Sequence, residues 1–549
     1  MNALISVSNI RILFGAMVWI ALATPVFAQG VSIPDTGLNA AIRDALQKPT
    51  GPLTEQDLLG LTNLNASGRN INSTIGLENA RNLMSLNLSQ NHLTEFSVPA
   101  ELTNLVTLDL SFNAITNFSA SGGPAAITTL NLADNQLGNL TLSGNLSRLT
   151  NLNLENNGFT VFNLPSSMTS MVALDIGFNS ITNCTLPNGL TNLTTLIASA
   201  NLFTNFTLPG DLTRLTSLDL HINGLTGFNL PEGLTALTNL DLDENTLTSF
   251  TLPAGMTNLV LLDLSFNQLT NLMLPDDLKS LIDLNLNLNQ FTSLELPTGM
   301  VQLGRLHLRG NQFADFTVPA DLGTLTYLDI SECPLLSSLT LPTNLNHLTA
   351  LRLSKNLLTS LVLPVGMTNL TGINLSENLL TNLVLPPDLF RLQSLNLGGN
   401  ELASLTLPTG MTNLTGFFVT GNNFTSLTLP PDMIRVNALG FLANPLETLV
   451  LSEPVAANLG DAISEIQNQG VVVFTYPLTP RLNLPRQTPE GTFDLAVNGP
   501  PGVYTFLASS DLTDWTELGV ATNTLGFARF LDTTPNRPAQ RFYQARSSR

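Results

Sequence analysis

Carboxylate side chains recur at one position of a regular pattern in this sequence, where they form a negative stripe able to attract cations. The sequence contains 17 copies of a repeat of about 22 residues, each marked by an asparagine or, once, a cysteine. Aspartate or asparagine stands four residues before that marker in 12 of the 17 copies. Three consecutive copies carry Asp219, Asp241 and Asp263, and Asp243 lies beside the second. Two unit charges ~5 Å apart repel by about 1 kcal/mol in water. A bound cation, a cationic partner or hydration relieves this repulsion. Hydration suffices, so the sequence predicts no metal and no cofactor.

Basic side chains gather at a second place. Arg305, His307 and Arg309 occupy alternate positions, although the chain has only 21 lysines and arginines and a formal charge of -19. Alternate residues of a strand project to the same side, and arginine and tyrosine are favoured anchors of protein interfaces. The sequence therefore predicts a partner-binding surface made of Arg305, His307, Arg309, Tyr327, Asp329, Arg352 and Lys355.

The pattern is interrupted between these basic residues. Cys333 stands where asparagine is expected, Pro334 follows it, and the next interval is 23 residues instead of 22. Breaks in an otherwise consistent pattern tend to lie at functional sites. The alternative interpretation is drift in a long array, in which the basic groups pair with Asp283, Asp329 and Glu332.

Residues suited to catalysis are sparse. None of the 4 histidines pairs with another at the spacing of metal ligands. The sequence also has no CxxC motif, no phosphate-binding glycine loop and no nucleophile elbow. We therefore predict that the protein is not an enzyme.

An asparagine repeat defines the elements that must position these residues. Asparagine recurs every 22 residues from Asn91 to Asn311 and again from Asn356 to Asn444, in the pattern L-x-x-L-x-L-x-x-N-x-L. The two leucines of L-x-L point to one face of a short strand. Each turn buries these leucines only by stacking on its neighbours, while the asparagine side chain can satisfy backbone groups that would otherwise be unpaired.

The second half of each repeat holds another apolar segment that ends in proline, as in LTLP, and proline disfavours a helix there. Seven phenylalanines occupy the same position of different repeats, which predicts that their rings form an internal spine in the core. The alternative is an exposed aromatic stripe that binds a ligand. The seven are Phe96, Phe118, Phe162, Phe206, Phe228, Phe250 and Phe316. Cys184 and Cys333 lie seven turns apart, roughly 34 Å. That separation excludes a disulfide.

This pattern resembles the leucine-rich repeat, in which asparagine or cysteine occupies the repeated position. The resemblance covers residues 61–452. It implies a β-rich solenoid with a parallel sheet on the concave face and short extended segments on the opposite face. Residues 29–60, with helical spacing at Leu38, Ala41, Ile42 and Leu46, resemble the helical cap of internalin-like exported bacterial proteins.

The ends of the chain suggest further units. Residues 1–28 resemble a secretory signal peptide. Arg11 precedes 13 apolar or small residues, and the expected cleavage follows the small residue Ala28. Apart from that segment we expect no membrane span. We predict a C-terminal cap at 453–478 with one helix and a last strand, a proline-rich linker at 479–490, and a small all-β module at 491–549.

Composition narrows the function. The chain is 43% hydrophobic and only 11% charged, and its acidity argues against nucleic acid as a partner. Together with the resemblance, this predicts a secreted or cell-envelope binding protein that engages a protein partner through its concave face. The alternative is a structural or adhesive cell-envelope protein that binds glycan or matrix. Few aromatic residues are placed to stack on sugars, which favours a protein ligand.

Overall fold

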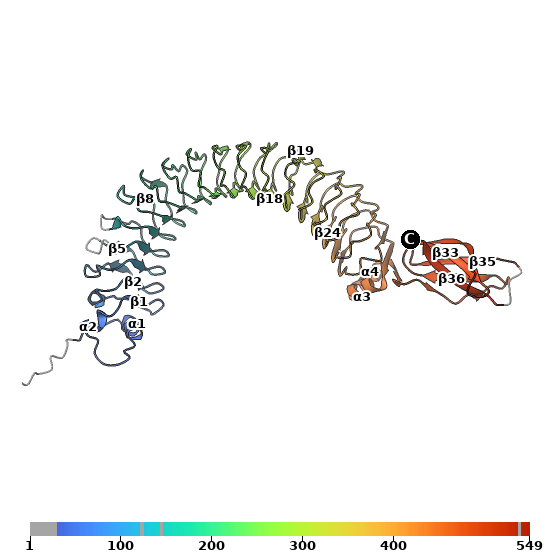
Figure 1. Cartoon of the computed structure of the whole chain (residues 1–549), viewed down its shortest axis with the longest axis horizontal. Helices are drawn as coiled ribbons and strands as arrows, with labels where there is room; N and C mark the ends of the chain where they lie inside the picture. Colours follow the sequence, from blue (N-terminus) through green and yellow to red (C-terminus); the bar gives the residue numbers. More distant parts are fainter. Residues whose placement is uncertain (1–29, 121–125, 143–145, 536–539, 549) are drawn as a thin grey trace, which may run out of the picture.

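The chain forms a long curved solenoid. The computed structural model describes residues 30–120, 126–142, 146–535 and 540–548, so the predicted signal peptide lies outside the described residues. Figure 1 shows successive turns stacked into an arc, with β18 on its inner side and β19 on its outer side. No helix among the described residues is long and apolar enough to cross a membrane.

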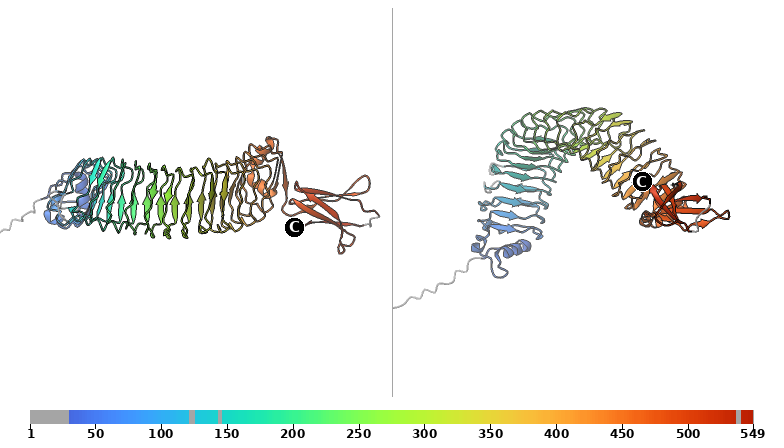
Figure 2. Two further views of the ribbon diagram at one scale, coloured as in Figure 1. Left: turned by 90° about the horizontal axis from the view of Figure 1, so that it is seen from above. Right: turned by 45° about the vertical axis from the view of Figure 1, so that its right-hand side comes forward.

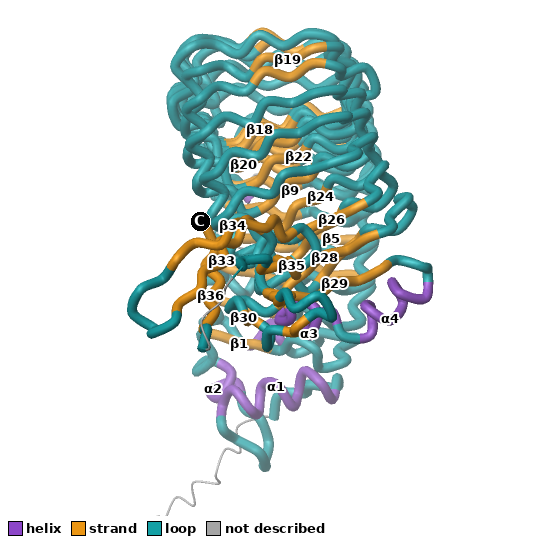
Figure 3. The backbone as a smooth tube through the Cα atoms, turned by 90° about the vertical axis from the view of Figure 1, so that its right-hand side faces the viewer, coloured by secondary structure: helices purple, strands orange, loops and turns teal. Residues whose placement is uncertain are grey.

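One parallel sheet of 18 strands lines the concave face. Its strands lie side by side along the solenoid in the left view of Figure 2. In Figure 3 its strands (orange) follow one another along the solenoid. Its strands are β1 (Asn63–Asn65), β2 (Ser85–Asn87), β4 (Thr107–Asp109), β6 (Thr129–Asn131), β7 (Asn151–Asn153), β9 (Ala173–Asp175), β11 (Thr195–Ile197), β12 (Ser217–Asp219), β13 (Asn239–Asp241), β15 (Leu261–Asp263), β17 (Asp283–Asn285), β18 (Arg305–His307), β20 (Tyr327–Asp329), β22 (Ala350–Arg352), β23 (Gly372–Asn374), β24 (Ser394–Asn396), β25 (Gly416–Phe418) and β27 (Ala438–Gly440).

Burial alternates along these strands because one face meets the core and the other meets solvent. In β13 the central Leu240 is 0% exposed, whereas Asn239 and Asp241 on either side remain accessible. Neighbouring strands pair in parallel with the register of the repeat, so that Asp219 lies opposite Asp241, and Asp241 lies opposite Asp263. The first and third residues of each strand therefore form continuous rows on the concave face.

Short extended segments form the opposite face, as the prolines predicted. Paired outer strands are β3 (Glu95–Ser97), β5 (Asn117–Ser119), β8 (Val161–Asn163), β10 (Asn183–Thr185), β14 (Phe250–Thr251), β16 (Leu272–Met273), β19 (Asp315–Thr317), β21 (Ser338–Thr340) and β26 (Ser426–Thr428). Helical structure in the repeats includes the 3-10 turn η1 (Leu77–Asn79).

The asparagines form a hydrogen-bonded ladder inside the turns. In a representative turn, the Asn245 amide donates to the carbonyls of Leu220, Leu242 and Asp243, at 3.0, 3.1 and 3.2 Å. Its Oδ1 accepts from the Leu225 N–H at 3.1 Å. Cys333 replaces this amide with a buried thiol 3.6 Å from the Leu308 carbonyl oxygen. Both cysteines are free.

The phenylalanine spine is buried, with each of its rings at most 7% exposed. Phe96 and Phe118 stack across successive turns, with centroids 6.4 Å apart. Phe162, Phe206 and Phe316 each contact another ring of their own turn; Phe203 and Phe206 meet edge to face at 5.0 Å. The spine is therefore part of the core, and the stripe interpretation is wrong for these seven residues.

Caps cover both ends of the solenoid. At the N-terminal end Asp35 accepts a hydrogen bond from Leu38 N–H and so starts α1, which buries Leu38, Ala41 and Ile42. The C-terminal cap contains two short helices, since Gly460 interrupts the single helix that the sequence suggested. The cap elements are α1 (Thr36–Leu46), α2 (Glu55–Leu58), β28 (Thr448–Ser452), α3 (Glu453–Leu459), α4 (Asp461–Asn468) and β29 (Val472–Tyr476).

A small antiparallel β module follows the cap. Its strands are β30 (Arg481–Leu482), β31 (Arg486–Gln487), β32 (Phe493–Asn498), β33 (Gly502–Ser509), β34 (Thr516–Asn523), β35 (Phe527–Asp532) and β36 (Phe542–Ser548). The predicted linker at 479–490 is wrong as a spacer: β30 and β31 both pair with β32. The prolines fall between these two-residue strands, where their missing N–H groups interrupt no long ladder.

Candidate functional site

The acidic stripe lies on strands β12, β13 and β15 of the concave sheet. Asp219 Oδ1 lies 2.6 Å from Nδ1 of His221, two residues further along the chain. Ser265 Oγ lies 2.7 Å from Asp243 Oδ1 and 2.5 Å from Asp263 Oδ1, and its single proton is shared between the two carboxylates. The neighbouring turn adds a further donor, because Asn285 Nδ2 bonds Asp263 Oδ2 at 2.8 Å. Neutral hydroxyl and amide donors thus hold much of the stripe in place.

Two carboxyl groups of this surface have a pKa raised above the ordinary value. Burial raises the pKa of Asp241 to about 6, and the nearby charges of Asp263 and Asp219 act in the same direction. Burial likewise raises the pKa of Asp175 to about 6, with Glu155 and Asp219 adding to the shift. Each of the two accepts a backbone hydrogen bond that opposes the shift without cancelling it.

Replacing Asp175 with asparagine should stabilise the protein at pH 7.5 and leave it unchanged at pH 4. The folded-state pKa of about 6 lies above the ordinary aspartate pKa of 3.8, so folding shifts the equilibrium toward the protonated form. Stability falls as the pH rises from 3.8 to 6, and the full cost of the charge is present above 6. We expect a melting temperature about 1 to 3 °C higher at pH 7.5. An equal gain at both pH values would exclude the charge as its cause.

The basic residues are arranged around two acidic ones. Arg305 Nη1 lies 3.2 Å from Asp283 Oδ2, and His307 Nε2 lies 3.3 Å from Asp283 Oδ1. Arg309 and Lys355 bind opposite oxygens of Glu332, at 2.8 and 3.1 Å, and these hydrogen bonds lower the pKa of the Glu332 carboxyl. The pairing interpretation is therefore correct for Asp283 and Glu332. Of the four basic partners, all except His307 keep much of their side-chain surface in solvent.

A stack of three side chains crosses the strands beside these ion pairs. The rings of His307 and Tyr327 have centroids 4.7 Å apart, and the Arg352 guanidinium carbon lies 5.3 Å from the centroid of Tyr327. Burial raises the pKa of the Tyr327 hydroxyl to about 12, so the ring stays neutral and suited to a cation–π contact. Tyr327 is half-buried, less open than the sequence suggested.

Asp329 does not belong to the exposed surface. It is 6% exposed, and its carboxylate accepts hydrogen bonds from Ser331 N–H, Ser331 Oγ and the Tyr327 hydroxyl, at 3.0, 2.5 and 3.1 Å. Its inclusion among the partner-binding residues is thus wrong, and so is its pairing with a basic group. It orients Tyr327 from below.

Beside the stack the concave face is hollowed into an open depression of about 570 Å³. Charged groups of Arg309, Glu332, Arg352 and Lys355 line one side, and Phe418 lines the other. Ala350 and Gly372 stand at the first position of two successive strands, where their small side chains leave the space open. A side chain built on Gly372 would meet nothing within 4 Å.

Sequence inspection missed two features of this surface. The first is the contact between His221 and the acidic stripe, which the spacing between histidines does not reveal. The spacing between His221 and Asp219 does indicate it, because residues two apart in an extended segment project to the same side. The depression was missed because small residues carry no chemistry of their own. Its signal was the run Ala350, Gly372 at the first position of successive strands.

Comparisons with known proteins agree with the repeat. A leucine-rich repeat family model matches residues 81–137, and a BspA-type leucine-rich repeat region model matches 176–272 and 264–376. A search of curated protein sequences found no significant match.

Two solved structures illustrate the similarity of fold. YopM from Yersinia enterocolitica WA-314 is 26% identical with a TM-score of 0.54, and the match covers 75% of this chain and 91% of YopM. The functional domain of InlJ from Listeria monocytogenes is 20% identical with a TM-score of 0.55, over 85% of this chain and 94% of that domain. Repeat, solenoid and matches together show that this chain is a leucine-rich repeat protein similar to the internalin-like and YopM proteins of bacteria.

Proposed function

We propose that the protein is a secreted, non-enzymatic binding protein, and that it engages a protein partner through the concave face around Tyr327 and Arg352. Leucine-rich repeat solenoids use their extended concave surfaces for binding. The observation that carries this proposal is the depression beside the Tyr327–Arg352 stack, where aromatic, arginine and small residues meet on an otherwise regular sheet. Secretion rests on the apolar segment after Arg11.

The contacts also indicate what the partner presents. Arg305 and Arg309 already have carboxylate partners in this chain. Among the described residues no carboxylate lies within ion-pair distance of Arg352, whose guanidinium is held over Tyr327. The partner therefore places an acidic group at Arg352 and a side chain in the space above Gly372.

Two variants test this function against a partner isolated by pull-down from the protein's native surroundings. Arg352→Ala removes the free cation, and Gly372→Gln fills the depression without strain, since its added side chain enters open space. Each should weaken binding about tenfold or more, as expected for an interface anchor.

Matched controls lie away from the concave face. Arg391→Ala removes an exposed arginine bonded to Asn369, and Gly138→Gln adds a side chain at another open glycine; neither should change affinity. Binding that survives both test variants would refute the proposed site. Capture of a glycan or matrix component, with no protein partner, would favour the adhesive alternative.

A further inference from the structure

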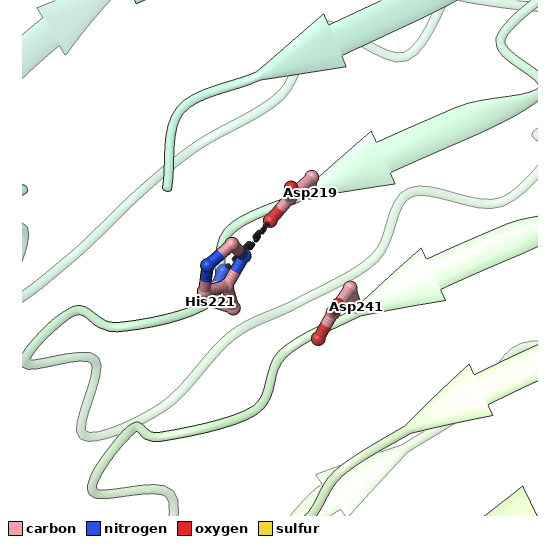
Figure 4. Close-up of side chains that lie close together, drawn as sticks. All are labelled: Asp219, His221 and Asp241. Atoms are coloured by element: carbon pink, nitrogen blue, oxygen red, sulfur yellow. Dashed lines mark hydrogen bonds and ion pairs between the residues drawn. The ribbon is translucent and has the colours of Figure 1, made fainter. Parts of the chain in front are cut away.

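We propose that Asp219, His221 and Asp241 form a binding site for one divalent first-row transition-metal ion, with Zn²⁺ as the best match. The three residues come from two successive turns. Asp219 ends β12, His221 follows it by two residues, and Asp241 ends β13 directly opposite Asp219. Figure 4 shows the three side chains close together on two neighbouring turns, with His221 linked to Asp219 by a hydrogen bond.

The donor atoms are close enough for one ion. One ligand atom from each residue lies within 4.8 Å of the other two. Zinc bonds to imidazole nitrogen and carboxylate oxygen are about 2.0 to 2.2 Å long, so ligand atoms around a tetrahedral zinc ion lie about 3.4 Å apart. Side-chain rotations of these half-buried residues bring the three ligand atoms onto one ion. The ion then replaces the proton shared by Asp219 and His221.

The kind of ligand selects the kind of metal. Imidazole suits zinc, copper, iron and nickel, whereas Ca²⁺ and Mg²⁺ take oxygen ligands. A histidine in the set therefore favours a transition metal over the hard cations that carboxylates alone would attract. His307 lies beside Asp283, but among the described residues only Asp219, His221 and Asp241 meet as a group of three.

The surrounding charge favours an ion here. Within the described part of the chain, no lysine or arginine lies within ion-pair distance of Asp219, Asp241, Asp243 or Asp263. The ligands are half-buried on the concave face, so the ion is reached from solvent. Three protein ligands leave a tetrahedral ion one open position, which water or a bound molecule can fill.

The test uses the full-length chain purified without a polyhistidine tag and stripped with EDTA. Calorimetric titration with ZnCl₂ should show one saturable site per chain, and Co²⁺ should give the visible absorption of a low-coordinate complex. His221→Gln and Asp241→Asn should each weaken Zn²⁺ binding by about 100-fold, because even loss of an outer-shell partner costs about 10- to 100-fold. Zinc should raise the melting temperature of the parent chain, and of neither variant.

His347→Gln is the control. This exposed histidine hydrogen-bonds the Gly323 carbonyl, at 3.1 Å, and is not one of the three proposed ligands, so its loss should leave Zn²⁺ affinity unchanged. Equal circular dichroism spectra for all variants would separate loss of the site from loss of the fold. The proposal is overturned if the parent chain shows no saturable binding at micromolar Zn²⁺, or if His221→Gln binds Zn²⁺ as tightly as the parent. The site lies three turns from Arg305, so neither result depends on the partner-binding proposal.

Discussion

Phe206→Ala should lower the free energy of unfolding by about 3 to 5 kcal/mol, the usual cost of removing a buried phenylalanine ring. Phe206 is 4% exposed, and its ring meets the edge of Phe203 at 5.0 Å. The substitution leaves a cavity in the middle of the solenoid, where each turn is supported only by its two neighbours. Urea denaturation followed by circular dichroism measures the loss.

Phe178→Ala is the matched control. Phe178 lies outside the core, 50% exposed, and its left-handed backbone conformation (φ 50) is the same difficulty for alanine as for phenylalanine. Its removal should change the free energy of unfolding by less than about 0.5 kcal/mol. Comparable losses in the two variants would contradict the division between an internal spine and exposed rings.

Much of the fold follows from the 22-residue period. A strand of three residues ends four places before the repeated asparagine, as β13 does before Asn245. The period also implies which residues are neighbours, because strand register equals the repeat length. Asp283 and Arg305 are 22 residues apart and pair in the structure, so this ion pair could be predicted from the sequence.

Other features depend on where side chains turn, which the repeat does not determine. Asp329 occupies an outward position of β20, yet it is buried because Ser331 and Tyr327 turn their hydroxyls onto it. Glu332 meets Arg309 and Lys355 from two neighbouring turns, and those partners are 23 residues away on either side. Contacts of this kind depend on rotamers and on the added residue after Cys333.

The C-terminal part lacks the repeat, and the prediction was weaker there. Proline-rich composition indicated a spacer, but composition cannot show whether a two-residue segment finds a partner. The strand β32 supplies one to both β30 and β31. The all-β nature of the module was nonetheless predictable, because its polar and apolar residues alternate between glycine and proline turns.

Asn245→Ala should be the most damaging polar substitution in the acidic region, costing about 3 kcal/mol of the free energy of unfolding. Asn245 is 6% exposed and makes four hydrogen bonds to the backbone. Alanine removes all four and leaves the Leu225 N–H and three carbonyls without this partner. Each buried group left unsatisfied costs about 1 to 3 kcal/mol. The three carbonyls keep other donors, Asn223, Asn267 and the Ile222 N–H, so the total stays near the upper end for one group.

Asn239→Ala, in the same turn, isolates the effect of burial. Asn239 is the exposed first residue of β13, so its loss should cost less than about 0.5 kcal/mol. Urea titrations of the two variants make the comparison, and equal losses would mean that the inner and outer faces of the turn have been assigned wrongly. Because the Asn245 amide binds Leu220, Leu242 and Asp243, it joins the segments that follow β12 and β13. The ladder that stabilises the solenoid therefore also holds Asp219, His221 and Asp241 within reach of one another.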